Sequence, residues 1–574
     1  KKSRLYFLSK TNQNIMLQCL AEEVRVSILD NLRKSGYMSI IMDTSTDVAK
    51  TDQLVMVARY CDNEGNIHEN LIAVSPAEDA TAKGLYDLFT EMCDSYNIDW
   101  RALLIGQSYD GANVMKGQVN GLRTLIQKEV PRAIYVWCNA HQLNLVIVDT
   151  CSSCNDAIHF FGVLECLYSY FGARKRNALF KIKQVELIPE QRPLRFKMLS
   201  TTRWSSHSSA IQMILLTFPA ILAALEELQK DNDSNTKNMA KSLVKKTKKF
   251  KFILMLVVFK NIFDITSPVS KYLQSANIDF FQAVTFIDRA LEQIIILRSR
   301  DNKNSVFSQI EQQAKSLACK WNIEPCLEVK RKITTKRIVG ETRSNESLLE
   351  PLDKFRCETF FVIVDALWSK FKSDFKESKA IVKEMSIFQI DKMSSVKSKT
   401  IALPSDSFTA ICNWLPEINM TQLKEEYLQL CQNLESIISG SKWPTTFHSN
   451  DNNYEDNISS SDTHSETENE SVQTPQSICE LFKLLSALEL RYTFPNVFLA
   501  IKALCTLPIG SASAERKFSK MKLIKTRLRS TTNDSRLEHM MLLTCEGLIE
   551  IDFDKAIDRM GTISSVYKKQ LMPS

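Results

Sequence analysis

The chain has 574 residues, with 73 Lys and Arg against 66 Asp and Glu and a formal net charge of +7. This length exceeds one ordinary hydrophobic core and predicts several domains or one large interrupted domain, while the small positive excess excludes a globally basic nucleic-acid coat. The 15 cysteines, without a signal-peptide pattern, indicate reduced thiols and hence the cytosol or nucleus. The longest purely apolar run, residues 252–259, is too short to span a bilayer, so no membrane partner is expected.

Short apolar runs separated by turns predict a mixed α/β domain over residues 37–155, after a helical lead-in over residues 1–36. A turn at residues 62–66 joins two of the runs as in a hairpin, and Thr81 is the expected cap of a helix. The order of the patterns is strand, strand, strand, helix, strand, helix, strand, which predicts a mixed sheet with helices. The expected strands are residues 37–42, 53–60, 67–74, 103–105 and 133–137.

Long helical patterns with few glycines over residues 156–447 predict an all-α region. Residues 448–477 lack Lys and Arg and are rich in Asn, Ser, Thr and acids, so we expect a disordered acidic linker. Residues 478–574 form a final helical group. The clearest helical patterns in these regions are residues 208–229, 280–298, 357–375, 423–438, 478–490, 496–504, 512–524 and 535–548.

Two aspartates follow apolar strand patterns. Asp43 comes after residues 40–42, and Asp110 comes after residues 103–109 and before Gly111, which would allow close backbone approach to a ligand. Taken alone, Asp43 is better explained as the start of a turn, and Asp110-Gly111 is also a common turn sequence. A third acid, Glu515, lies far downstream among hydroxyls and cations at helical spacing; alone, it would be a solvated surface charge.

Two further blocks give these acids meaning. The first is Cys138-x-x-His141 followed by Leu-Asn-Leu, and the second contains Arg203 and Trp204. These two blocks lie between Asp110 and Glu515 in the chain. Together with the three acids they resemble the hAT family of DNA transposases, in the zinc finger MYM-type protein 1-like branch. The resemblance implies a ribonuclease H-like core with a mixed five-stranded sheet and helices, interrupted by a large α-helical insertion. It also implies that a C-terminal hAT dimerisation region, residues 478–574, completes this core.

The resemblance implies a DDE-type site in which Asp43, Asp110 and Glu515 hold two Mg²⁺ or Mn²⁺ ions for DNA cleavage and strand transfer. Sparse carboxylates suffice because Mg²⁺ prefers oxygen ligands and keeps several waters. Trp204 would stack on an extruded base, Arg203 would contact a phosphate, and His141 would lie beside the scissile phosphate. The alternatives are a core aromatic for Trp204 and a surface ion pair for Arg203.

The pattern Cys138, His141, Cys151 and Cys154 also has the composition of a Cys3His zinc site. Core-like apolar residues surround the segment, and a buried thiol beside a histidine is the simpler interpretation. Zinc is therefore the less favoured of the two.

A basic stretch beside Glu515 is the leading DNA-binding candidate, although some of its cations could form a solvated helix face. Residues 241–251 are a second, lysine-rich candidate. The final helices supply the expected interface of a homodimer or larger homo-oligomer, or alternatively pack within the fold. The DNA-binding residues of the first stretch are Arg516, Lys517, Lys520, Lys522, Lys525, Arg527 and Arg529, and those of the interface are Met540, Met541, Leu543 and Leu548.

Two positions depart from the branch. Thr44 stands where an acid is common directly after the first aspartate, and Lys116 adds a charge near the second. The leading hypothesis is a nuclear transposase or transposase-derived protein that binds DNA and self-associates. The alternative is a domesticated, non-catalytic nuclear regulator with the same fold; a ribonuclease H-like nuclease unrelated to transposition fits the other blocks less well.

Overall fold

The computed structural model describes residues 9–196, 205–275, 280–299, 305–328, 350–376, 381–440 and 475–563, except positions 382, 384, 399–402, 405, 476 and 509. The chain divides into two compact units, and each is considered by itself. The first unit consists of Lys1–Cys138, Ala276–Gln282 and Ser378–Ser574, and the second of Asn139–Ser275 and Ala283–Glu377.

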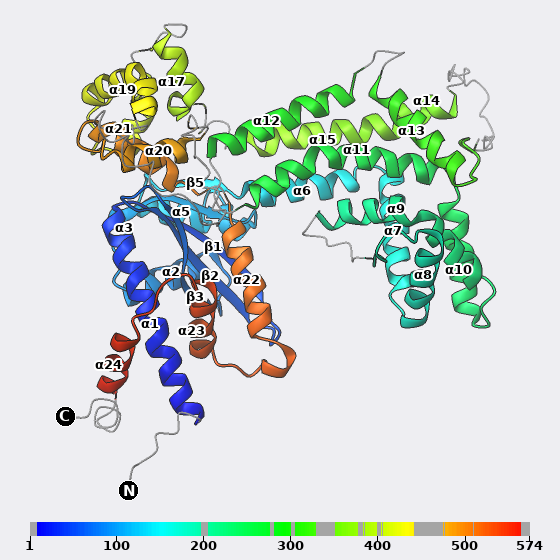
Figure 1. The fold of residues 1–574 in the computed structure, drawn as a ribbon, viewed down its shortest axis with the longest axis horizontal. Helices are drawn as coiled ribbons and strands as arrows, with labels where there is room; N and C mark the ends of the chain where they lie inside the picture. The colour runs from blue at the N-terminus through cyan, green and yellow to red at the C-terminus, as the bar shows by residue number, and fades with distance from the viewer. Residues whose placement is uncertain are drawn as a thin grey trace, which may run out of the picture. The chain divides into compact units, whose positions relative to one another are not determined.

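A five-stranded mixed sheet with the order β3-β2-β1-β4-β5 forms the centre of the first unit (Figure 1). The three strands β1, β2 and β3 pair antiparallel, whereas β1, β4 and β5 pair parallel. The predicted mixed α/β domain is thus confirmed, and each expected strand overlaps an observed one. The strands are β1 (Met38–Thr46), β2 (Asp52–Cys61), β3 (Ile67–Pro76), β4 (Leu104–Tyr109) and β5 (Ile134–Trp137).

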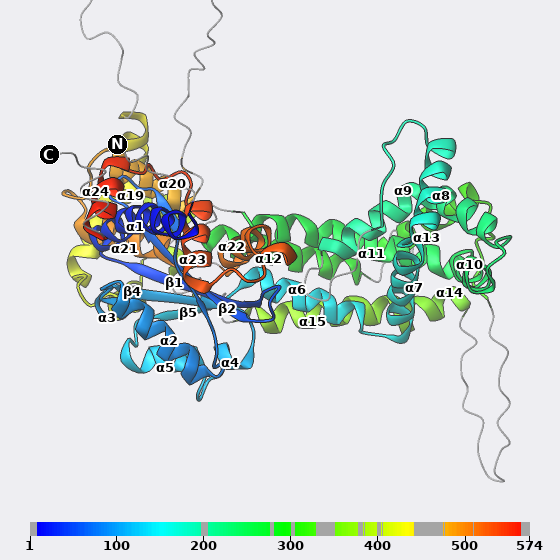
Figure 2. The same cartoon turned by 90° about the horizontal axis from the view of Figure 1, so that it is seen from below.

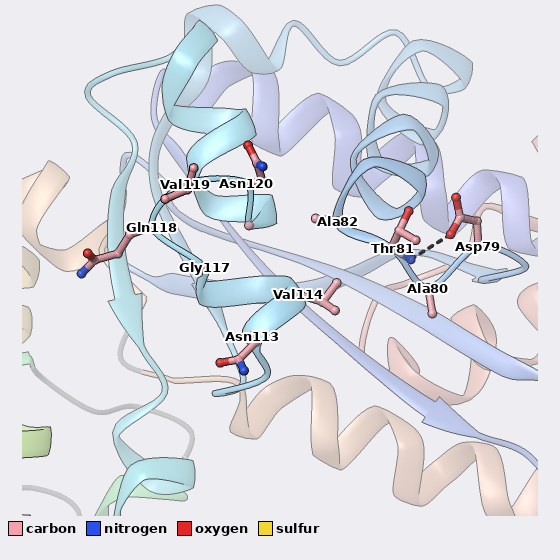
Figure 3. A pocket seen from close by; sticks show the side chains of 11 residues that line it. Asp79, Ala80, Thr81, Ala82, Asn113, Val114, Gly117, Gln118, Val119 and Asn120 are labelled. Atoms are coloured by element: carbon pink, nitrogen blue, oxygen red, sulfur yellow. Dashed lines mark hydrogen bonds between the residues drawn. The ribbon is translucent and has the colours of Figure 1, made fainter.

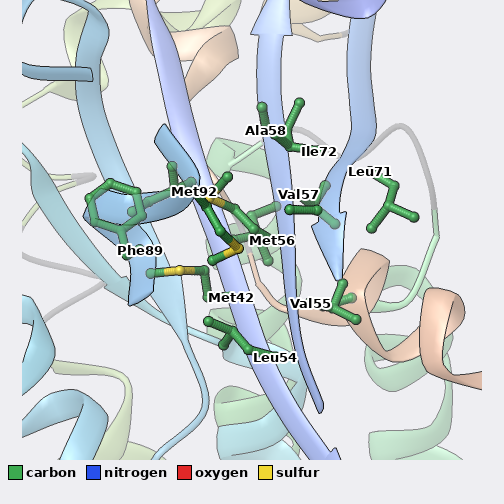
Figure 4. Close-up of a cluster of buried hydrophobic side chains, with 14 of the residues drawn as sticks. Met42, Leu54, Val55, Met56, Val57, Ala58, Leu71, Ile72, Phe89 and Met92 are labelled. Carbon is green, nitrogen blue, oxygen red and sulfur yellow. The ribbon is translucent and has the colours of Figure 1, made fainter. Parts of the chain in front are cut away.

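The sheet is buried on both faces, which explains why its central strands are continuous apolar runs rather than alternating patterns. Every residue of β2 after Asp52 is buried. Helix α2 (Ala82–Ser95), capped by Thr81 as predicted, places Phe89 and Met92 in the same core as Met42 and Met56 (Figure 4). Phe518 and Met521, from the C-terminal region, belong to this core too.

The two ends of the chain pack together in the first unit. Helix α1 (Lys10–Ser35) contacts α23 (Asp534–Cys545) and α24 (Phe553–Ile563), α22 (Ala512–Ile524) packs on β1 and β2, and α23 packs on β3 (Figure 1). Because α22 and α23 bury apolar side chains against strands that precede them by hundreds of residues, the core closes only when the C-terminal helices return to the sheet.

Other helices cover the rest of the first unit. Trp414 fastens one of them, since its indole Nε1 donates to the carbonyl oxygens of Ile105 at 3.2 Å and Arg132 at 2.9 Å. These helices are α3 (Trp100–Leu103), α4 (Asn113–Lys116), α5 (Leu122–Glu129), α17 (Ile390–Lys397), α18 (Thr409–Trp414), α19 (Met420–Gly440), α20 (Ile478–Ala487), α21 (Pro495–Thr506) and the 3-10 turns η2 (Ser386–Phe388) and η4 (Arg527–Arg529).

The described part of the second unit is helical. Its helix α6 packs against α15 and α11, and the two views show α6 and α15 side by side (Figure 2). The helices are α6 (Asn139–Cys151), α7 (Asn155–Phe171), α8 (Arg174–Leu187), α9 (Ser205–Leu228), α10 (Ser234–Thr247), α11 (Phe250–Leu273), α13 (Val306–Lys320), α14 (Pro351–Phe355), the π-helix η1 (Arg356–Phe360) and α15 (Phe361–Asp374); α12 (Phe280–Leu297) begins in the first unit and continues in the second.

The expected domain boundaries need correction at two places. The sheet unit ends at Cys138 rather than at residue 155, because α6 packs with the helical unit. The helices between residues 385 and 440 belong to the sheet unit, so the helical unit is shorter than residues 156–447. Of the expected acidic linker, all but Pro475 and Ser477 lies outside the described residues.

Two helices are long and apolar enough to cross a membrane by length and composition: Ser206–Leu228 and Phe250–Leu273. The apolar windows of these helices are 61% and 67% buried inside the protein, respectively, and most of the apolar residues of the second pack against other helices. Their apolar character is accounted for by the core of a helical unit.

A buried ion pair joins the C-terminal end of α22 to the turn after β1. The Lys525 Nζ lies 2.6 Å from Asp47 Oδ2, and the two side chains are only 4% and 1% exposed. Asp47 also accepts hydrogen bonds from the backbone of Ala49 and Thr51 and from Gln53 Nε2. Burial by itself would raise the pKa of Asp47, but these hydrogen bonds, with that of Lys525, lower it overall.

Replacing Lys525 by Met should lower the free energy of unfolding by roughly 3 to 5 kcal/mol, because Asp47 would keep a buried charge without its cation. Urea denaturation measures this difference. Lys522→Met on the same helix is the matched control, since Lys522 is exposed and should change stability by less than about 0.5 kcal/mol. Equal effects of the two substitutions would contradict a special role for Lys525.

Candidate active site

The parallel pairing of β1 and β4 brings two predicted carboxylates to one end of the sheet. The register aligns Ile41 with Ser108. Continuing it by two residues on each strand brings Asp43 level with Asp110, which follows the last residue of β4. The carboxyl ends of neighbouring parallel strands lie at the same edge of a sheet, where α/β proteins place their functional groups.

Helix α22 supplies the third carboxylate, Glu515, in its first turn. Between Glu515 and Lys525 this helix rises about 15 Å. Between Asp43 and Asp47 the chain extends about 13 Å along β1 and beyond its end. These lengths allow Glu515 to lie level with Asp43 when Lys525 is paired to Asp47, and α22 packs on both β1 and β2.

Asp110 and Glu515 each lie close enough to Asp43 for their charges to act on its carboxyl group. Its pKa is raised well above the usual value, first by burial, then by the negative charge of Asp110, then by that of Glu515. The hydrogen bond that Asp43 Oδ1 accepts from the Thr44 amide at 2.9 Å acts in the opposite direction. Two acids that are remote from Asp43 in sequence therefore lie within electrostatic range of it, and their joint role as a site stays a prediction.

Carboxylates within electrostatic range of Asp43 would suit a hard divalent cation, since each contributes oxygen ligands and positive charge would relieve their repulsion. They do not form a closed cage: among the described residues, no three His, Cys, Asp or Glu side chains are grouped closely enough to hold one ion. These two observations are compatible, because Mg²⁺ keeps several waters and is bound by few protein ligands.

The loop after Asp110 is held rigidly against β5. Asp110 Oδ1 accepts a hydrogen bond from the Ala112 amide at 3.1 Å. A Cβ on Gly111 would lie 2.8 Å from the ring of Trp137, so this glycine admits the indole ring rather than leaving space for a ligand. The Lys116 Nζ lies 3.8 Å from the centre of the same ring and makes a cation–π contact with it. Lys116 is the residue whose charge is unusual for the branch.

The predicted DNA-binding set on α22 needs correction. Lys517 is buried and forms an ion pair with Glu546, and Lys525 is buried against Asp47, so neither ammonium group is free to meet a phosphate. Lys520 donates to the carbonyl oxygens of Thr544 and Cys545, at the end of α23. The residues that remain exposed are Arg516, which also pairs with Glu69, and Lys522, Arg527 and Arg529.

The second lysine-rich segment divides in the same way. Lys248, Lys249 and Lys251 form ion pairs with Glu226, Glu328 and Asp156. In contrast, Lys241 and Lys245 of this segment are exposed and form no ion pair with any described residue, and neither does the exposed Lys237, one turn earlier on α10. This free lysine ridge consists of Lys237, Lys241 and Lys245.

The zinc alternative gains no support within the described residues. Cys138 is fully buried at the end of the sheet unit, whereas His141, Cys151 and Cys154 belong to the helical unit. Burial raises the pKa of the Cys151 thiol far above its usual value, which disfavours the thiolate that zinc requires. His141 lies on α6 in the helical unit, so its expected place beside the scissile phosphate stays a prediction. Arg203 and Trp204 lie outside the described residues.

The predicted dimer interface also changes. Met541 is fully buried in the core of the first unit and cannot face another molecule, while Met540 and Leu543 are partly buried against that core. Leu548 is fully exposed and remains available for an interface. The alternative of packing within the fold is thus correct for Met541.

Two acids that the sequence did not single out hold α22 in place through ion pairs. Glu546 accepts hydrogen bonds from the Leu71 amide and Asn70 Nδ2 and pairs with Lys517, which fixes α22 and α23 to β3. Asp47 holds the other end of α22. In the sequence, only the position of Asp47 shortly after Asp43 could have indicated its importance. Its partner Lys525 lies hundreds of residues away.

Comparisons with known proteins agree with this architecture. Residues 2–121 match the family model described as ZMYM1/FAM200, RNase-like domain, and residues 460–545 match the hAT family C-terminal dimerisation region. The chain is similar to the 52 kDa repressor of the inhibitor of the protein kinase from Homo sapiens and from Mus musculus. Each is 22% identical over 581 residues, which cover 96% of this chain and 67% of the relative.

Asp43→Asn should raise the stability of the metal-free protein by roughly 1 kcal/mol at neutral pH, because burial and the neighbouring acids disfavour the charged carboxylate in the folded state and the amide carries no charge. Because the folded-state pKa of Asp43 is raised, the stability that its protonated form contributes is fully present in acid. That stability is lost as the pH rises through the folded-state pKa. The gain should therefore vanish in acid. Thermal unfolding in EDTA at both pH values tests this, with the exposed Asp87→Asn as control; a gain of the same size in acid would contradict it.

Proposed function

From the RNase-like domain and the C-terminal dimerisation region that make this chain a hAT-like protein, we propose that it is a hAT-type transposase or a transposase-derived protein that binds DNA and self-associates. The observation that supports a catalytic capacity most directly is the parallel β1–β4 register, which aligns Asp43 with Asp110, while the charge of Glu515 also acts on Asp43. The order of the strands and the inserted helical unit favour a ribonuclease H-like core for this site.

In this proposal Asp43, Asp110 and Glu515 hold two Mg²⁺ or Mn²⁺ ions. When bound, such ions lower the pKa of an attacking hydroxyl and neutralise charge on the phosphodiester in an in-line displacement. The protein contributes the spacing of the carboxylates through the β1–β4 register, and it fixes the third acid through the two buried ion pairs of α22. Asp110 is held in orientation by the Ala112 amide.

The activity is tested with Mn²⁺ and DNA that carries the ends of the element to which the gene belongs. Nicking should fall by more than about 100-fold in Asp110→Ala and Glu515→Ala, since each removes metal ligands needed in the transition state. Thermal stabilisation by Mn²⁺ should vanish in the same variants, which gives a second readout without DNA.

Lys522→Ala is the control, because this exposed lysine lies on the helix of Glu515 but outside the carboxylate site. If nicking or Mn²⁺ stabilisation persists in both carboxylate variants, the metal site is elsewhere. If wild-type protein binds DNA and shows neither effect, the second candidate, a non-catalytic nuclear regulator that retains the fold, is favoured.

DNA binding in the helical unit is proposed for the free lysine ridge. An α-helix rises 1.5 Å per residue, so Lys237, Lys241 and Lys245 extend over about 12 Å. A DNA duplex presents a negative charge about every 1.7 Å along its axis, and lysines without acidic partners can neutralise those charges. Lys245 lies near enough to Glu328 to lower the pKa of that acid without pairing to it.

Changing the three ridge lysines to Gln should weaken duplex binding at every sequence and reduce the salt slope, log Kd against log salt, by about 3 units if each meets one phosphate. The matched control is the triple Gln variant of Lys248, Lys249 and Lys251, whose charges already face carboxylates. Fluorescence anisotropy over a salt series measures both. A smaller slope change in the ridge variant than in the control would contradict the assignment.

A further inference from the structure

A pocket of about 780 Å³ opens beside the loop that follows Asp110. It is lined by the loop before α2, by α4 and by the α4–α5 turn (Figure 3). Helix α4 begins at Asn113, three residues after Asp110, and the intervening turn is fixed by the Ala112 hydrogen bond. The pocket is thus joined to the proposed catalytic carboxylates by one short segment.

The lining excludes an anionic ligand. No Lys or Arg is among the lining residues, and Asp79 contributes a negative charge. Its carboxylate accepts a hydrogen bond from the Thr81 amide at 2.9 Å, which lowers its pKa and keeps it ionised. A phosphate would therefore meet repulsion here, in contrast to the exposed cations elsewhere on the chain.

The remaining lining suits a neutral, planar heterocycle. Val114 and Val119 are exposed apolar side chains, with Val119 75% exposed, and they offer contact for a flat ring. Asn113, Gln118 and Asn120 also line the pocket, and their side-chain amides make no hydrogen bond to any described residue. An amide both donates and accepts, as the edge of a nucleobase requires.

The pocket has a preformed wall because of two glycines. The Gly121 amide donates to the Gly117 carbonyl at 3.0 Å, and Thr124 Oγ1 donates to the same oxygen at 2.8 Å. A Cβ on Gly121 would lie 2.3 Å from Gly117 N, so this tight turn requires glycine. Buried Met115 and Leu122 anchor the turn from below. Val119 and Asn120 are thereby presented on a fixed backbone.

We propose that this pocket binds an unpaired nucleobase of the DNA strand adjoining the phosphodiester at the carboxylate site. The inference rests on the proposed DNA-processing function and adds to it a base-binding subsite on the Asp110 side. Contact with the base would position the strand, whereas the lysine ridge and the exposed cations of the α22 region are suited to bind its phosphates.

The test compares two fluorescent single strands of equal length and charge: oligo(dT), and an abasic oligomer without bases. In EDTA, wild-type protein should bind oligo(dT) about ten-fold more tightly, the size expected for one well-bound base. The double variant Val119→Ala with Asn120→Ala should lose most of this ratio and keep its affinity for the abasic strand.

The matched control is Val185→Ala with Asn232→Ala, which removes an exposed valine and an exposed asparagine from the helical unit. It should keep the wild-type ratio. An unchanged ratio in the pocket variant, or a wild-type ratio near one, overturns the base pocket and leaves DNA binding intact. Failure of wild-type protein to bind either strand or any duplex overturns the proposed function itself.

Discussion

Helix α22 is held on the sheet by two buried ion pairs, and the arrangement of the site depends on them. Lys517 meets Glu546 in the middle of the helix, and Lys525 meets Asp47 at its end. An unpaired charge is costly in a low-dielectric interior, and sliding α22 along the sheet would break both ion pairs at once. Apolar packing alone would tolerate more than one register, because side chains such as Phe518 and Met521 can repack.

This clamp holds Glu515 near two other acids that repel it. The raised pKa of Asp43 shows that the fold places negative charge where burial and neighbours both disfavour it. Such local conflict is expected at functional sites, where the surrounding structure holds groups in an unfavourable state that a ligand relieves. The extensive core shared by the sheet, α2, α22 and α23 supplies the compensating stability.

The distribution of cations separates structural from surface roles. The basic stretch over residues 516–529 contains two kinds of cation. Buried lysines form ion pairs within the fold, and exposed residues are accessible to a polyanion. The same division occurs in the helical unit, where paired lysines follow the free lysine ridge. The pocket beside α4 differs from both in having no cation in its lining, which makes it suitable for a base rather than a phosphate.

The sequence by itself determined the strands and most helices. Apolar runs and turn residues act locally, so the position of Asp43 at a strand and of Asp110 just after another followed from pattern alone. Their pairing with Glu515 rested on resemblance, because no local signal links residues so far apart.

Only the tertiary structure decided which charges are buried and which residues share a core. Met541 and Leu548 look alike in sequence, yet one is fully buried and the other fully exposed. Gly111 admits the ring of Trp137, a partner from a different strand, and the boundary at Cys138 depends on which helices α6 meets. The physical reason is common to all of these: burial and ion pairing are set by contacts between distant segments, whereas periodicity and turn chemistry report only on neighbours along the chain.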